Sequence, residues 1–160
     1  VRVPCRRHRH STGAPRAGRY ASTMTDEIDT GPFPLGEENT AYAQYFIGTS
    51  HLAPLSTEQV NISNVTFEPG CRNNWHIHHA DTGGGQILLV TAGRGYYQEW
   101  GAEPVELHPG DVVNVPAGVK HWHGAAPDSW FTHIAIAVPG EGLDNEWLEP
   151  VADEDYDRLG

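Results

Sequence analysis

The sequence predicts an all-β fold, a single barrel or double-sheet arrangement of short strands. Its composition, with 18 Gly and 12 Pro among 160 residues, is typical of many strands joined by tight turns. Runs rich in β-branched and aromatic residues recur at regular spacing along the chain. The length suits one domain, and no apolar run approaches the length of a membrane span. We therefore expect one barrel without a membrane segment.

The expected elements follow in order from the N-terminal side. Residues 24–40 are expected to form an irregular acidic arm, because 30–36 hold two Pro and two Gly. The predicted strands are 42–47, 60–67, 86–91, 95–100, 103–107, 111–115, 119–123 and 130–138. We expect residues 95–100 to pair back on 86–91 as a hairpin. The longest run, 130–138, is expected to close the barrel, and 149–159 to form a helical turn.

Composition divides the chain into four parts. They are a basic leader (1–23), an N-terminal arm with the first strand (24–58), the barrel (59–150) and a C-terminal tail (151–160). The leader contains six Arg and no acidic residue, which resembles a transit peptide. The simpler interpretation is a wrongly assigned translation start, since Met24 opens an ordinary sequence. We favour that interpretation and expect residues 1–23 to be disordered.

The remaining body is strongly acidic. Without residues 1–23, four basic residues stand against 21 acidic ones, a net charge of −17. Nucleic acid and anionic membranes are therefore poor partners. Cys71 is then the single cysteine, which favours a reducing compartment. We expect a bacterial, cytoplasmic protein in which Cys71 is a small buried residue rather than a catalytic thiol.

Three histidines form the pattern of a metal site. His76 and His78 are two residues apart, so in a strand both side chains point to the same face. Two neutral imidazole nitrogens on a rigid sheet suit a divalent first-row metal ion. His121, 43 residues after His78, would add a third ligand from a neighbouring strand. Such a site leaves open positions for water or substrate and predicts chemistry inside the barrel.

Glycines and prolines stand at fixed distances from these histidines. Gly70, Gly110 and Gly118 each follow or accompany a proline and mark turns between strands. The resulting order resembles the two signature motifs of the cupin superfamily, carried here by Gly70, His76, His78, Gln86 and Gly93, and by Gly110, Pro116, Gly118 and His121. The resemblance implies a cupin barrel (a double-stranded β-helix or jelly roll) with an irregular N-terminal arm.

The resemblance also implies one divalent metal ion, held by two histidines and an acidic residue of the first motif and one histidine of the second. Gln86 occupies the acidic position, and Ala125 stands where the second motif has Asn. A neutral glutamine ligand would leave the metal charge uncompensated, which favours Lewis-acid chemistry and an anionic substrate. Asp81 and His79, on the glycine-rich loop before Gln86, are alternative ligands.

Four segments resemble a narrower group, the bacterial manganese-dependent cupin hydroxynitrile lyases. The segments are 65–70, 86–93, 108–113 and 120–127. This resemblance implies that His76, His78, His121 and Gln86 hold the metal, and that His123 and His133 lie beside the substrate. A histidine would take the hydroxyl proton of a cyanohydrin, and cyanide would leave. The longer loop before Gln86 and the presence of Ala137 instead of a pocket glutamine are departures from that group.

The last long strand supports a catalytic role for these two histidines. Alternation places His133, Ala135 and Ala137 on one face together with Phe131. Small side chains on that face would leave space for a ligand beside the metal. His123 and His133 are therefore candidates for acid/base catalysis, since histidine titrates near working pH. The alternative is that each is a hydrogen-bonded histidine of the barrel.

Three functions remain open at this stage. The first is a metal-dependent enzyme, a carbon–carbon lyase, acting on a small hydroxy or carbonyl compound, including cyanohydrins. The second is an iron-dependent cupin dioxygenase, because three histidines also support oxygen binding. The third is a non-catalytic cupin that binds a small molecule. Manganese is the expected metal, with iron or zinc as alternatives, and a homo-oligomer paired through sheet edges is the expected assembly.

Overall fold

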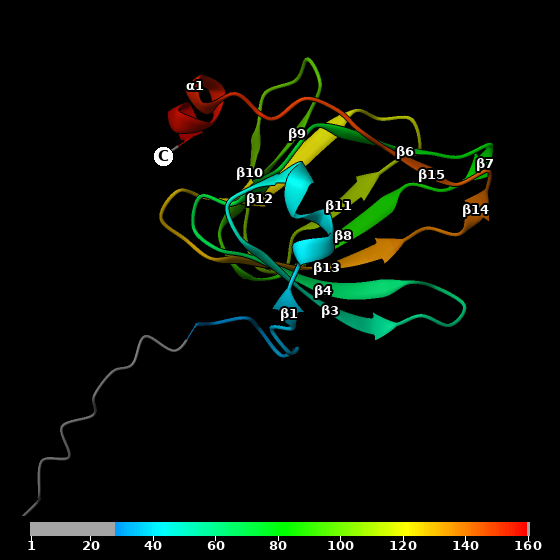
Figure 1. Ribbon diagram of the computed structural model, residues 1–160, viewed down its shortest axis with the longest axis horizontal. Helices are drawn as coiled ribbons and strands as arrows, with labels where there is room; N and C mark the ends of the chain where they lie inside the picture. The colour runs from blue at the N-terminus through cyan, green and yellow to red at the C-terminus, as the bar shows by residue number, and fades with distance from the viewer. Residues whose placement is uncertain (1–27, 160) are drawn as a thin grey trace, which may run out of the picture.

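The computed structural model describes residues 28–159, and its fold is the all-β barrel that the sequence predicts (Figure 1). The expectations for the basic leader and for a start at Met24 lie outside these residues. The strands are β1 (Glu37–Glu38), β2 (Phe46–Ile47), β3 (Ser50–Ser56), β4 (Ile62–Phe67), β5 (Arg72–Asn73), β6 (His76–His79), β7 (Thr82–Gly83), β8 (Gln86–Gly93), β9 (Gly95–Glu99), β10 (Val105–Leu107), β11 (Val112–Val115), β12 (His121–Ala125), β13 (Phe131–Ala137), β14 (Gly140–Glu141) and β15 (Asp144–Trp147). The helical elements are the 3₁₀ helices η1 (Thr40–Tyr45) and η2 (Asp157–Leu159) and the short α1 (Asp153–Tyr156).

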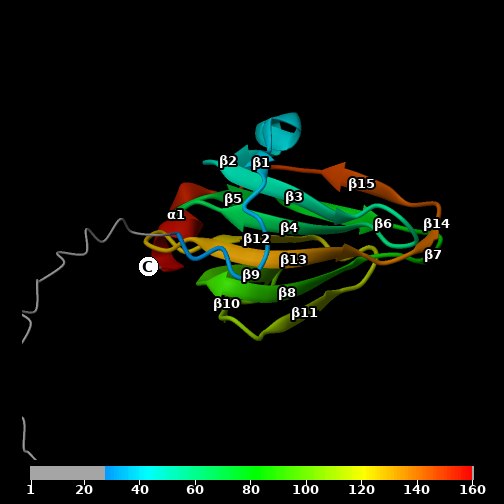
Figure 2. The ribbon, with the colours of Figure 1, turned by 90° about the horizontal axis from the view of Figure 1, so that it is seen from below.

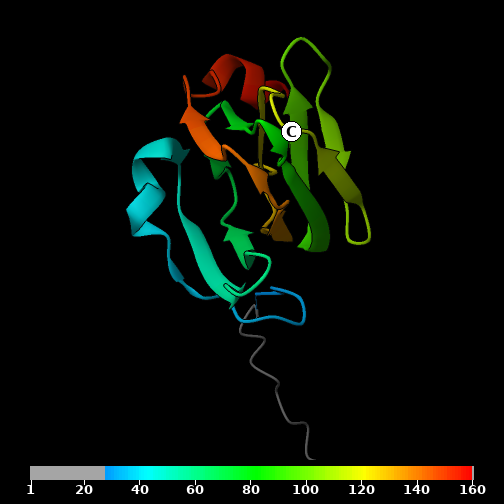
Figure 3. The same ribbon diagram turned by 90° about the vertical axis from the view of Figure 1, so that its right-hand side faces the viewer.

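Two antiparallel sheets form the barrel. One has the order β1-β3-β4-β13-β8-β11, and the other has β10-β9-β12-β5-β2, with β6 paired to both β12 and β15. Figure 2, seen from below, has the first sheet towards the viewer, running from β1 at the top to β11 at the bottom, and Figure 3 shows the strands bent around a common interior. Strands β6, β8, β12 and β13 carry the histidines and the glutamine that the sequence marks. The fold therefore directs residues from both sheets towards one interior.

The interior is apolar at one end. Strand β8 buries every second residue (Leu88, Val90 and Ala92), the period-two pattern of a strand with one face on a core. Phe67 and Phe131, which face each other across β4 and β13, are fully buried and pack at 6.3 Å between ring centroids. This packed end supports the polar end, where the histidines lie.

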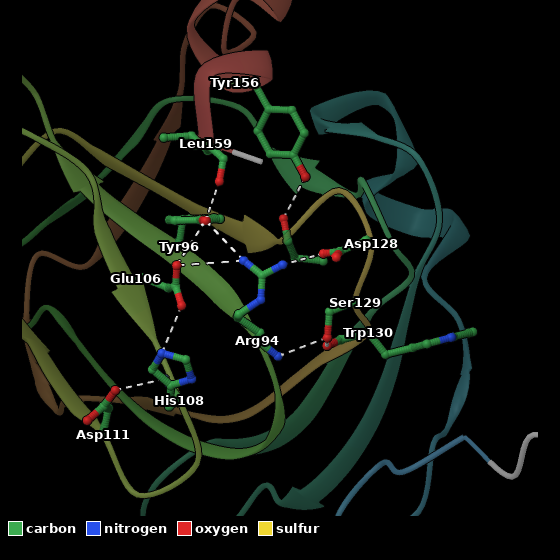
Figure 4. A network of polar contacts seen from close by, with 11 residues as sticks. Arg94, Tyr96, Glu106, His108, Asp111, Asp128, Ser129, Trp130, Tyr156 and Leu159 are labelled. Carbon is green, nitrogen blue, oxygen red and sulfur yellow. Dashed lines mark hydrogen bonds and ion pairs between the residues drawn. The ribbon is translucent and has the colours of Figure 1, made fainter.

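A second apolar cluster lies under the C-terminal segment. It contains Trp75, Tyr96, Trp122, Ala126, Val151 and Tyr156. The Tyr156 hydroxyl donates to the carbonyl oxygen of Ala125 at 2.6 Å, and Tyr96 contacts the carbonyl oxygen of Leu159 (Figure 4). These bonds fasten α1 and η2 to the barrel, where residues 149–159 were expected to form a helical turn.

Most predicted strands are confirmed. There are three exceptions, one in the extent of a strand and two in how strands are arranged. Residues 42–47 do not form one strand, because η1 occupies Thr40–Tyr45 and only Phe46–Ile47 is extended. The hairpin of 86–91 with 95–100 is wrong, since β9 crosses to the other sheet and pairs with β10 and β12. Strand β13 lies between β4 and β8, inside its sheet rather than at a closing edge.

The second exception has a local cause. Gly93, at the end of β8, has φ +72°, and a Cβ there would lie 1.9 Å from the carbonyl oxygen of Trp130. The chain turns so tightly at this glycine that β9 leaves the plane of β8. Among residues 28–159, none of the helices is long and apolar enough to span a membrane.

Candidate metal centre

The three motif histidines meet inside the barrel. His76 and His78 lie on β6, and His121 lies on β12, where it is the direct register partner of His76. Their potential ligand atoms all lie within 4.8 Å of one another. The spacing of two along β6 thus places both side chains on the face that meets β12, as the sequence predicts. This cluster is a candidate site for one metal ion.

Each imidazole is oriented by a hydrogen bond at Nδ1. His76 bonds the carbonyl oxygen of Asn74 and His121 that of Val119, both at 2.9 Å, while His78 bonds the side-chain oxygen of Asn145 at 2.6 Å. Because an oxygen of this kind only accepts, Nδ1 carries the hydrogen in all three rings and Nε2 keeps its lone pair. The cluster therefore has the tautomer that binds metal through Nε2.

The free nitrogens lack any other partner in the described part of the chain. Nε2 of His78 and Nε2 of His121 are buried and make no hydrogen bond, as is the case for Oε1 of Gln86. Buried polar atoms in folded proteins almost always have a partner. A bound cation would satisfy these two nitrogens of the cluster, together with the amide oxygen of Gln86 on the wall of the same cavity, so these residues fit a metal ion.

Burial keeps two rings of the cluster, His76 and His121, neutral. It lowers the pKa of His121 to about 4, and it lowers the pKa of His76 well below the usual range, an effect that the neighbouring His121 and His78 increase. Neutral rings are required for metal binding, because a protonated imidazole has no lone pair to give. At pH 7 these two rings need no deprotonation before they can bind a metal.

Gln86 is the candidate fourth ligand. It opens β8, and it lines the same cavity as His76 and His78. The alternatives from the sequence do not join the cluster: His79 is half-exposed and bonds Glu146 at 2.7 Å, and Asp81 is exposed. Gln86 as a ligand stays a proposal, supported by its place on the cavity wall and its unpartnered oxygen.

The cluster borders a cavity of about 270 Å³. Phe46, Phe67 and Trp147 give it an aromatic wall, and Ala135 and Ala137 also line it. A second cavity of about 240 Å³ shares His78, Gln86, Asn61, Ala137 and Asn145 with the first. The alternation predicted for β13 is confirmed for its two alanines. Phe131, expected on the same wall, instead packs behind the cavity in the core, 5.2 Å from the His133 ring.

His123 and His133 extend the polar side of this cavity. Their rings lie 5.0 Å apart and perpendicular, and both line the cavity. Burial lowers the pKa of His133 to about 3 and holds that of His123 well below its usual range. Neither nitrogen of His133 has a hydrogen-bond partner among the described residues. A neutral ring with two unpartnered nitrogens can exchange a proton with a ligand.

Asn73, on β5, holds His123 from behind. Its Oδ1 accepts the backbone N–H of His123 at 3.0 Å, and its Nδ2 lies 3.2 Å from the Nε2 of the ring. Sequence reasoning missed Asn73 and also missed Asn145 and Trp147. No local pattern marks these three residues, because each reaches the site through a strand pairing that is distant in sequence.

Cys71 has no part in this chemistry. It is fully buried just before β5, and burial raises the pKa of its thiol to about 12. A thiol of this kind stays protonated and unreactive at neutral pH. The expectation of a small buried residue is confirmed.

Comparison with known proteins agrees with this geometry. Residues 63–132 match the family described as "Cupin domain". The (R)-mandelonitrile lyase of Granulicella tundricola is 46% identical over 120 residues, covering 72% of this chain and 88% of that protein. A cupin-like protein of Thermotoga maritima is 38% identical, with a TM-score of 0.71 over 80% of this chain and 96% of that one. A DMSP lyase of Ruegeria pomeroyi is 18% identical, with a TM-score of 0.53 over 71% and 57%, and shares the fold alone.

Proposed function

Because this chain belongs to the cupin family, we propose that it is a metal-dependent lyase acting on a small hydroxy or carbonyl compound. The observation that carries the proposal is a cluster of three imidazoles, each held by a hydrogen bond at Nδ1, beside a cavity that two further neutral histidines line. The relative named (R)-mandelonitrile lyase supports an aromatic cyanohydrin as the substrate.

His76, His78, His121 and Gln86 would hold the metal. Nitrogen and oxygen ligands of this kind suit manganese, iron or zinc, and we propose manganese from the resemblance of the motifs. When bound, such an ion supplies Lewis-acid polarisation of a substrate oxygen. Imidazole and amide groups bind a metal as neutral ligands, so they would leave the charge of the ion available to that oxygen.

The protein's own part in the reaction is binding and proton transfer. The rings of Phe46, Phe67 and Trp147 suit an aromatic substrate. Trp147 stacks on His76, and Phe67 lies against His123 and His133, so a substrate ring bound there would hold its hydroxyl group next to the histidines. His133, neutral and unpartnered, would accept the hydroxyl proton. The bond between carbinol carbon and nitrile then breaks, cyanide leaves with its electron pair, and the oxygen becomes the carbonyl of the aldehyde.

The proton taken up by His133 is returned in the second half of the reaction. A proton on His133 is destabilised by burial, so the ring gives it up readily to the departing cyanide. The products are one aldehyde and one hydrogen cyanide. No oxidant is consumed, which distinguishes this proposal from an iron-dependent dioxygenase.

The test is mandelonitrile cleavage by chelator-treated protein to which manganese, iron or zinc is returned, with and without oxygen. We expect release of benzaldehyde that requires metal, is independent of oxygen and falls at least about 100-fold in His133→Leu. Cleavage that persists in the metal-free protein would contradict the proposal. Oxygen consumption coupled to product would favour the dioxygenase, and binding without turnover would favour a non-catalytic cupin.

A further inference from the structure

The three histidines differ in what holds them. The Nδ1 atoms of His76 and His121 donate to backbone carbonyl oxygens two residues before each ring in the chain, Asn74 and Val119. His78 instead donates to a side chain, that of Asn145 on β15. A backbone acceptor survives any side-chain substitution, whereas the Asn145 acceptor does not. His78 is therefore the ligand whose orientation depends on one replaceable residue.

His78 also needs that partner most. His76 and His121 are almost fully buried, and His76 borders one cavity, whereas His78 is only partly buried and borders both cavities of the site. A ring with space on two sides can rotate about its side-chain bonds unless a hydrogen bond fixes it. The 2.6 Å bond to Asn145 supplies that constraint and fixes the hydrogen on Nδ1.

The register of strand β15 places Asn145 next to His78. The strand pairs antiparallel with β6, so that Asn145 lies directly opposite His78 and Trp147 opposite His76. The Trp147 ring stacks on the His76 ring at 4.7 Å and on Tyr45 of η1 at 4.6 Å. Two backbone hydrogen bonds of Trp75, to Leu148 and Glu149, continue the attachment beyond the strand. The strand is thus tied down next to Asn145.

We propose that Asn145 is a positioning residue that fixes His78 as a metal ligand and thereby sets the metal affinity of the centre. This inference rests on the proposed function, since it needs a metal at the cluster. Asn145 contacts a ligand and not the metal itself. A neutral amide fixes the ring without adding negative charge to the site, in contrast to the carboxylate that often fills this role.

The test compares metal affinity in the full chain and its variants. Manganese and zinc dissociation constants are measured by competition with a chelator of known affinity. Asn145→Ala should weaken binding about 10–100-fold, the usual cost of losing such a partner. Asn145→Asp, which keeps an oxygen acceptor, should restore affinity to at least the wild-type value.

The matched control is Glu146→Ala. Glu146 is the next residue of β15 and bonds His79, a histidine outside the cluster, so its loss removes a similar bond without touching a ligand. Its metal affinity should equal that of the wild type. Nitrogen NMR on the metal-free proteins gives a second readout: His78 should hold Nδ1–H in the wild type and lose that preference in Asn145→Ala.

Several outcomes would overturn the inference. Wild-type affinity and an unchanged His78 tautomer in Asn145→Ala would show that the bond positions nothing. Equal weakening in Glu146→Ala would assign the effect to docking of β15 as a whole. A wild-type protein that binds no metal would overturn this inference together with the proposed function, whereas metal binding that ignores Asn145 would overturn the inference alone.

Discussion

Four buried imidazoles meet in the centre of this barrel, and burial keeps them neutral. For His76, His121, His123 and His133, loss of hydration is the first cause of a lowered pKa. The same burial that prepares two rings for a metal prepares the other two for proton exchange. Their neutrality has a consequence for stability that can be measured without knowing the substrate.

The metal-free protein should lose stability in acid. An unfolded histidine takes up a proton near pH 6.5, but folded His133 does so only near pH 3. Between these values the unfolded state holds more protons, so the free energy of unfolding falls as the pH falls, by about 1.4 kcal/mol per pH unit and group. Urea unfolding from pH 7 to 4 measures the slope. His133→Leu should have a shallower slope, and an unchanged slope would contradict the neutral state of this ring.

Gln86 is tested by changing its charge and its length. Gln86→Ala removes the proposed oxygen ligand and should lower manganese affinity by about 10-fold or more. Gln86→Glu adds a negative charge beside the cation and should bind manganese more tightly than the wild type. Chelator competition measures both. Equal affinity in all three proteins would place Gln86 outside the metal centre.

The residues of the site were predictable from the sequence only where local spacing, such as strand alternation, marks them. His76, His78 and His121 follow from strand alternation and from the turns around them, and they meet as expected. Asn145 and Asn73 could not be found this way. Asn145 is 67 positions from His78 in the sequence, and Asn73 is 50 positions from His123. Strand pairing brings each asparagine to its histidine, and no local rule assigns such partners.

At the scale of elements, β8 and β9 show how one glycine directs the chain. The turn at Gly93 brings the backbone against Trp130 and sends β9 to the opposite sheet. This places β9 beside β12, which carries His121 and His123. The requirement for glycine at position 93 is therefore structural and does not depend on the metal.

Two glycine variants separate conformational strain from close contact. Gly110→Ala, at φ +100° with open space around it, should lower the free energy of unfolding by about 1–2 kcal/mol. Gly93→Ala meets the same strain plus a carbonyl oxygen 1.9 Å away, so its loss should be clearly larger. Urea unfolding measures both. Equal losses would show that the Trp130 contact relaxes freely.

The strands that sequence reasoning missed have weak local signals. Strand β3 holds Pro54, which disfavours strand interiors, and β15 is an acidic run ending in Trp147. Both become strands because a neighbour supplies the hydrogen bonds, β4 for one and β6 for the other. Conversely, the aromatic run 42–47 was predicted as a strand, but Tyr42 and Tyr45 pack towards Trp147 from η1.

At the scale of the whole molecule, the C-terminal segment covers the outside of the sheet that holds the metal cluster. Tyr156 is buried there, with the Arg72 guanidinium 4.1 Å from its ring centroid and its hydroxyl on Ala125. The segment packs on Trp75 and Trp122, on the face of the sheet opposite the cavity. It contributes to stability and not to the lining of the site.

Tyr156→Phe tests whether the C-terminal segment contributes to stability alone and not to the metal site. The change removes one buried hydrogen bond and keeps the ring, so the free energy of unfolding should fall by about 1 kcal/mol. Metal affinity should not change. Urea unfolding and chelator competition measure the two quantities, and a loss of metal with Tyr156→Phe would show that the outer cluster and the site are coupled.

Metal content is the measurement that bears most directly on the central claim, that His76, His78 and His121 form one metal centre. Elemental mass spectrometry on the wild type, His121→Ala and His79→Ala, after reconstitution, gives the stoichiometry. We predict nearly one manganese, iron or zinc ion per chain in the wild type and in His79→Ala, and almost none in His121→Ala. No bound metal in the wild type, or full metal content in His121→Ala, would contradict the account.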